Sequence, residues 1–119
     1  MKAEPMLTIR EEQMAAFEEL RMADFLRELR EFLGEILARK GVAVTPELLT
    51  GEVDALMQKA RRFHLKREKD IARVGELLCL NWGGISGAAL TRKMLGVLYT
   101  YGMDPEEKLR RFEETIPRT

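Results

Sequence analysis

Residues suited to nucleophilic or metal chemistry are few in this chain. It has one histidine, His64, and one cysteine, Cys79. A cysteine–histidine nucleophile would require the two side chains to meet in space. The pattern places His64 at a helix end and Cys79 among leucines in an apolar stripe, where a free cysteine behaves as a small apolar residue. We therefore expect Cys79 to be buried and inert.

Other patterns of chemistry-bearing residues do not indicate a catalytic or cofactor site. A zinc site needs several Cys or His ligands at short spacing, and the chain has one of each. The Gly-Gly pair at 83–84 lacks the following Lys-Ser or Lys-Thr of a phosphate-binding loop. Carboxylate pairs such as Glu18/Glu19 lie beside arginine on helix flanks, as on a solvated face. We predict no catalytic residue, no metal and no cofactor, and hence a protein that is not an enzyme.

Length and composition favour one soluble domain. The chain has 119 residues, of which 45% are hydrophobic and 34% charged, and its 20 basic residues balance its 20 acidic residues. A dedicated nucleic-acid-binding protein is usually strongly basic. No apolar run approaches the roughly 20 residues that cross a bilayer, and the start does not resemble a signal peptide. With a single cysteine, these features predict a cytoplasmic protein.

A long helical pattern follows a short arm at residues 1–7, which we expect to be flexible. Thr8-Ile9-Arg10-Glu11 has the form of a capping box, and Gly41 supplies a left-handed stop. The helix expected from about Ile9 to Lys40 would be about 48 Å long. Its apolar residues form two adjacent rows, one with Ile9, Met14, Phe17, Phe25, Leu29, Phe32 and Ile36, and the other with Met22, Leu26, Leu33 and Leu37.

Two further helices are expected in the middle of the chain. Thr45 as the cap and Pro46 in the first turn predict a helix that ends near Phe63. After a turn at 64–65, the apolar pattern predicts another helix from about Arg67 to Leu80. The sequence Asn-Trp-Gly-Gly at 81–84 ends it.

Two more helices are expected near the C-terminus. Ser86 is the predicted cap of a helix that carries Tyr101 on its apolar face and ends at Gly102. Asp104-Pro105 starts the last helix, with Glu107 as the acid of a capping box, and this helix ends near Pro117. No strand is predicted.

The expected fold is all-α: a single compact bundle of about five helices over residues 8–116, built on the long first helix. Ten inward positions should form its core: Phe25, Leu29, Phe32, Leu56, Phe63, Ile71, Val74, Leu78, Met94 and Leu98. If Phe32 is fully buried, Phe32→Ala should cost about 3–5 kcal/mol.

Two surface features are candidates for function. The first is a basic run of Lys59, Arg61, Arg62, Lys66, Arg67, Lys69 and Arg73, opposed only by Glu68 and Asp70. The favoured interpretation is a charged surface balanced by the acidic first helix; the alternatives are a surface for an acidic partner and, less favoured, one for nucleic acid. The second feature is Trp82, which either covers the core or anchors a partner, because tryptophan is enriched at binding hot spots.

The order of motifs resembles a group of small all-helical proteins encoded beside type VI secretion spike and effector genes. Three segments carry this resemblance: Ile9-Arg10-x-Glu12-Gln13-Met14-x-x-Phe17, then Ala60-Arg61-Arg62-Phe63 to Asp70-Ile71, and Glu106-Glu107-Lys108-Leu109-Arg110. This sequence departs from the pattern where His64 replaces a glycine, where Lys66 replaces a capping Thr or Ser, and at 81–84. The resemblance implies a bacterial adaptor, chaperone or immunity partner of a secreted effector, and it implies no site residues.

The favoured function is therefore a non-enzymatic accessory protein that binds an effector or spike component. The alternative is a nucleic-acid-binding regulator that uses the basic turn around residues 59–73. An apolar row left over on the first helix would suit another chain, so we expect a homodimer or a stable hetero-complex. The candidate partner-binding residues are Met22, Leu26, Arg61, Arg62, Lys66 and Trp82.

Overall fold

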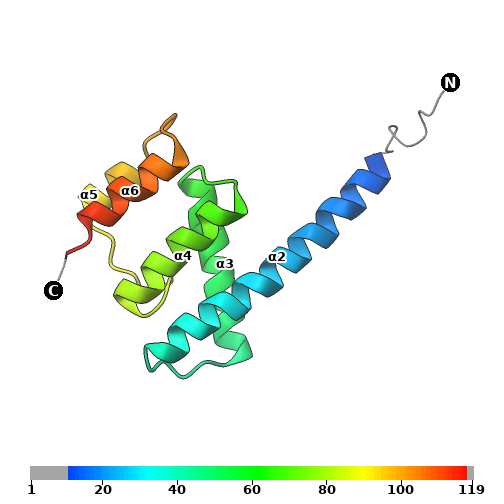
Figure 1. Ribbon diagram of the computed structural model, residues 1–119, viewed down its shortest axis with the longest axis horizontal. Helices are drawn as coiled ribbons and strands as arrows, with labels where there is room; N and C mark the ends of the chain where they lie inside the picture. The colour runs from blue at the N-terminus through cyan, green and yellow to red at the C-terminus, as the bar shows by residue number, and fades with distance from the viewer. Residues whose placement is uncertain (1–10, 118–119) are drawn as a thin grey trace.

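The computed structural model describes residues 11–117, and for residues 11–20 it describes the backbone alone. The described part is all-helical, which confirms the predicted fold class. Its helices are α2 (Glu11–Arg39), α3 (Pro46–Arg62), α4 (Glu68–Trp82), α5 (Arg92–Leu98) and α6 (Pro105–Thr115). In Figure 1, α4 lies between α2 on one side and α6 on the other, α3 packs against α2 and α4, and α5 accompanies α6. No helix among residues 11–117 is long and apolar enough to cross a membrane.

The end of α2 forms as the sequence predicts. Gly41 adopts a φ of 83°, in the left-handed region where glycine has no steric penalty. The Val42 amide donates to the Leu37 carbonyl and the Gly41 amide to the Ala38 carbonyl, each at 3.0 Å, which satisfies the last carbonyls of the helix. The predicted start at Ile9, its cap at Thr8 and the arm at 1–7 lie outside the described residues, so the full length of this helix stays a prediction.

The predicted starts of α3 and α6 are confirmed by their cap contacts. The Thr45 hydroxyl accepts from the Leu48 amide at 3.1 Å. The Asp104 carboxylate accepts from the Glu106 and Glu107 amides at 3.1 and 3.2 Å. In α6, only the Asp104 half of the predicted capping box forms.

The Glu107 side chain bonds Arg110 and Arg111 on its own helix instead of closing the capping box. Charge-assisted bonds of this kind are stronger than a bond to a neutral amide, which explains the preference.

The helix predicted from Ser86 is wrong, because α5 begins later and Thr91 caps it by accepting from the Met94 amide at 3.2 Å. The segment before α5 is held by Glu52, a buried carboxylate on α3. This carboxylate accepts from the Ile85 amide at 2.9 Å, the Ser86 amide at 3.1 Å and the Ser86 hydroxyl at 2.8 Å. Ser86 thus donates to a distant helix instead of capping a helix of its own.

The core contains nine of the ten predicted residues, and Cys79 is fully buried within it, as expected. The exception is Phe32, which is only partly buried at the edge of the core. The burial predicted for Phe32 is therefore wrong. The cost of about 3–5 kcal/mol for Phe32→Ala depended on the substitution leaving a cavity, so a smaller loss is expected for a ring at the edge of the core.

Candidate functional site

The six predicted partner-binding residues do not form one site. Arg61 and Arg62 end α3, and Lys66 lies in the turn that follows. Trp82 lies at the opposite end of α4, a helix of 15 residues that is about 22 Å long at about 1.5 Å per residue. Met22 and Leu26 lie on α2. The structure therefore separates the candidates into three places.

Two of these candidates serve the core. Trp82 and Leu26 are both partly buried and pack against buried apolar residues. For Trp82, this contact agrees with the interpretation that the indole covers the core. Neither side chain presents its whole apolar surface to a partner.

Met22 differs from them because it is 46% exposed. It lies seven and eleven residues before Leu29 and Leu33, and this spacing places the three residues on one face of α2. Leu29 and Leu33 are 1% and 0% exposed, since α3 and α4 cover that part of the face. The core-facing side of α2 thus continues to Met22, which the described part of the chain leaves exposed to solvent.

Beside this face is a groove of about 270 Å³ between α2 and α4. Its apolar lining comes from Phe25, Leu29, Phe32 and Ala72, and its charged edge comes from Glu28, Glu68 and Lys69. This groove was not predicted from the sequence, because Phe25 and Phe32 were both expected in the core and only Phe25 is buried there. Phe25 and Phe32 are seven residues apart on one face, and that spacing was the available signal.

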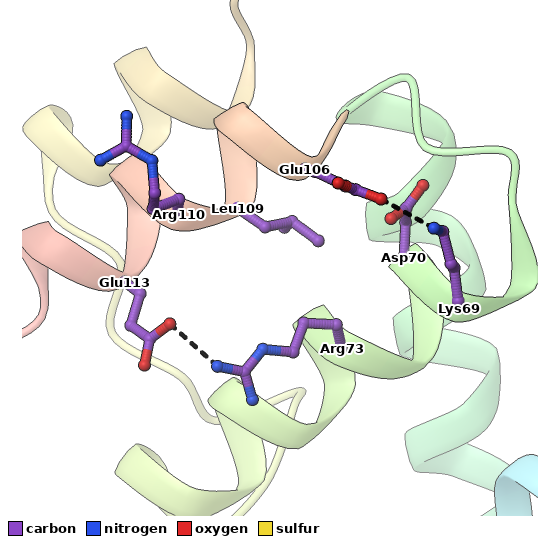
Figure 2. Close-up of a pocket in the computed structure, with 7 residues that line it drawn as sticks. All are labelled: Lys69, Asp70, Arg73, Glu106, Leu109, Arg110 and Glu113. Carbon is purple, nitrogen blue, oxygen red and sulfur yellow. Dashed lines mark hydrogen bonds and ion pairs between the residues drawn. The ribbon is translucent and has the colours of Figure 1, made fainter. Parts of the chain in front are cut away.

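A second hollow, of about 300 Å³, lies between α4 and α6 and is charged instead of apolar (Figure 2). Two ion pairs cross it: Lys69 Nζ to Glu106 Oε1 at 2.7 Å, and an Arg73 nitrogen to Glu113 Oε1 at 2.9 Å. Leu109 lies between them on α6. We refer to this hollow as the α4–α6 cleft.

The charges of the α4–α6 cleft are paired within the protein. The bond from Lys69, with the positive charges of Lys69 and Arg67, lowers the pKa of Glu106. The Arg110 guanidinium bonds Glu107 and Glu114 on its own helix. The Lys69–Glu106 and Arg73–Glu113 ion pairs attach α6 to α4 and indicate a structural role for the cleft.

The pairing also shows which described acids bond residues of the basic run. Arg67 bonds the buried Asp70 at 2.7 Å, and Lys69 and Arg73 bond acids of α4 and α6. Among the described side chains, the acids that bond these three residues belong to α4 and α6, and balance of the run by the acidic first helix stays a prediction.

Three other residues of the basic run, Arg61, Arg62 and Lys66, are exposed and make no ion pair among the described side chains. Two tyrosines lie beside their turn. The Tyr101 ring meets His64 edge-on with centroids 5.3 Å apart, and the Tyr99 ring meets Phe63 at 5.4 Å. We call Arg61, Arg62, His64, Lys66, Tyr99 and Tyr101 the basic–aromatic surface.

Tyr101 was expected on the inner face of a helix, and this is wrong. It is 84% exposed, because α5 ends at Leu98 and the following turn carries the tyrosine outward. Tyr99 is 46% exposed. Sequence pattern could not detect these rings as surface residues, because their orientation depends on where the short helix stops.

The backbone under the basic–aromatic surface is held in place. His64 adopts a φ of 60°, in the left-handed region that is unfavourable for a side chain with a Cβ. The Leu65 amide donates to the Ala60 carbonyl at 2.9 Å, and Lys108, which is 2% exposed, donates from Nζ to the Phe63 carbonyl at 2.7 Å. A cation at the C-terminal end of α3 is also favoured by the helix dipole.

Two buried groups in the described part, Cys79 and Lys108, have altered acidity. Burial, together with the negative charge of Glu52, raises the pKa of Cys79 to about 12. Burial lowers the pKa of Lys108, but this amine is enclosed and bonded to backbone. Among the described residues, no three His, Cys, Asp or Glu side chains are grouped to hold a metal.

Comparisons of the chain with known protein families, with curated protein sequences and with solved structures found no match.

Proposed function

We propose that this protein is a non-enzymatic accessory protein that binds another protein through α2 and the groove between α2 and α4. The observation that carries the proposal is the uncovered apolar face at Met22. A methionine that continues a buried face, next to a groove with aromatic residues, is typical of an interaction surface.

The shape of this surface favours a helical partner segment. Grooves between two helices receive the apolar side of an amphipathic helix, whose anchors recur at three- and four-residue spacing. Phe25, Phe32 and Ala72 would contact such anchors, and Glu28 would face a basic residue of the partner. A second copy of this chain is one such partner, as is an unrelated protein.

The resemblance of the sequence motifs to proteins encoded beside type VI secretion genes adds a proposed setting. In that setting the partner is a secreted effector or spike component, and the protein is its cytoplasmic adaptor, chaperone or immunity partner.

Co-purification with the products of neighbouring genes tests the proposal. Met22→Glu should abolish capture, because it places a charge on the apolar face. Leu80→Glu is the matched control, since Leu80 is an apolar residue exposed to a similar extent, 42%, and lies near the C-terminal end of α4. Equal capture by both variants would contradict the proposed surface, and light scattering of the isolated protein would show whether the partner is a second copy.

A further inference from the structure

The basic–aromatic surface combines an exposed aromatic ring with an unfavourable backbone conformation. Tyr101 is 84% exposed, yet its ring contacts His64, a residue held in an unfavourable left-handed conformation. Unfavourable backbone geometry that the surrounding contacts maintain is found often at binding sites. The bonds from Leu65 and Lys108 maintain it here.

The charges at this end differ from those elsewhere along the basic run. Arg67, Lys69 and Arg73 are neutralised by acids of α4 and α6. Arg61, Arg62 and Lys66 are exposed around the turn and make no ion pair among the described side chains. The positive charge of the run is thus concentrated next to the exposed tyrosines.

We propose that the basic–aromatic surface binds an acidic protein segment, with Arg61, Arg62 and Lys66 contacting its carboxylates and Tyr101 packing against an apolar side chain between them. Arginine and tyrosine are the residue types most enriched at protein-binding hot spots. This inference rests on the proposed function in assuming a protein partner, but it concerns a surface separate from Met22.

An acidic protein segment is favoured over nucleic acid by the small number of the charges. Three cations would neutralise few phosphates, whereas nucleic-acid binding draws its affinity from many. A short segment that alternates acidic and apolar residues therefore fits the three cations and the exposed Tyr101 ring better than a continuous phosphate backbone.

The test is an NMR titration of the full-length protein with a synthetic peptide of Asp and Glu residues around a central Leu-Pro pair. Amide shifts should concentrate at residues 61–66 and 99–103. Arg61→Glu/Arg62→Glu should weaken binding about tenfold or more by replacing attraction with repulsion. Tyr101→Ala should weaken it about fivefold through lost packing.

The matched control is Arg39→Glu/Lys40→Glu, which reverses a basic pair at the C-terminal end of α2 and should leave peptide affinity within about twofold. Met22→Glu should also leave it unchanged, so failure of this inference can be told from failure of the proposed function. Shifts centred elsewhere, or equal losses in the control, would overturn the inference. Tighter binding of a single-stranded oligothymidylate, with affinity falling steeply with salt, would overturn it in favour of nucleic acid.

Discussion

Removing the Glu52 carboxylate should destabilise the protein more than any surface substitution. Glu52 is 5% exposed on α3 and accepts three hydrogen bonds from the segment before α5. Its oxygen lies 2.5 Å from where a Cβ on residue 84 would be, so Gly84 is what allows this close approach. The contact joins α3 to the chain that leads to α5 and then to Tyr99 and Tyr101.

The expected loss for Glu52→Ala follows from what each donor can do afterwards. Ile85 is fully buried, so its amide would lack a partner, at a cost of about 1–3 kcal/mol. Ser86 is exposed, so water can replace its two bonds and their loss costs about 1 kcal/mol. The sum is about 3 kcal/mol, or a melting temperature lower by about 12 °C at about 4 °C per kcal/mol.

Urea unfolding followed by circular dichroism measures this loss. Ser86→Ala alone removes only the bond from the hydroxyl, one of these two, and should cost about 0.5 kcal/mol. In the Glu52→Ala background it should cost almost nothing, because that bond is already gone. Asp54→Ala is the control, an exposed carboxylate on the same helix that should change stability by less than about 0.5 kcal/mol. A loss for Glu52→Ala below about 1 kcal/mol, or additive effects of the two substitutions, would refute the reasoning.

Two other predictions concern buried titratable groups. Burial lowers the pKa of Lys108 below its ordinary value of 10.5, so between the folded and the unfolded pKa the unfolded chain binds more protons and the stability contributed by this group rises with pH. The unfolding free energy of the native protein minus that of Lys108→Met should therefore increase as pH is raised toward 10.5. A difference that does not change with pH would contradict the assignment. Cys79, with its pKa raised to about 12, should resist iodoacetamide at pH 8 in the folded protein and react in urea. Mass spectrometry measures the label. Rapid labelling of the folded protein would show that the thiol is accessible and would contradict the prediction.

The parts of the fold that sequence predicted well are those decided by neighbouring residues. Thr45, Asp104 and Gly41 act on amides or carbonyls within a few residues, so their roles are visible in the chain itself. Ser86 has the same residue type as a cap, but its partner is on α3, 34 residues earlier. A local rule cannot foresee a carboxylate that arrives from another helix.

Lys108 shows the same limit within a helix. It shares the inner face of α6 with Leu109 and Phe112, so its position along the chain predicts burial. Its charge predicts exposure. The carbonyl of Phe63, at the end of α3, resolves the conflict, and only the packing of α6 against that end brings the two together.

The basic run could be recognised from the sequence because its charges lie close together along the chain. The acids of α6 that pair with Lys69 and Arg73 lie far away in sequence, so these ion pairs could not be predicted. Lys69 and Glu106 are 37 residues apart, and Arg73 and Glu113 are 40 apart. Without those contacts, all seven basic residues looked equivalent. Lys69 and Arg73 bond acids of α6 and Arg67 bonds Asp70 within its own turn, whereas Arg61, Arg62 and Lys66 make no ion pair among the described side chains. The placement of α6 against α4 thus separates Lys69 and Arg73, which stabilise the fold, from Arg61, Arg62 and Lys66, for which we propose an acidic partner.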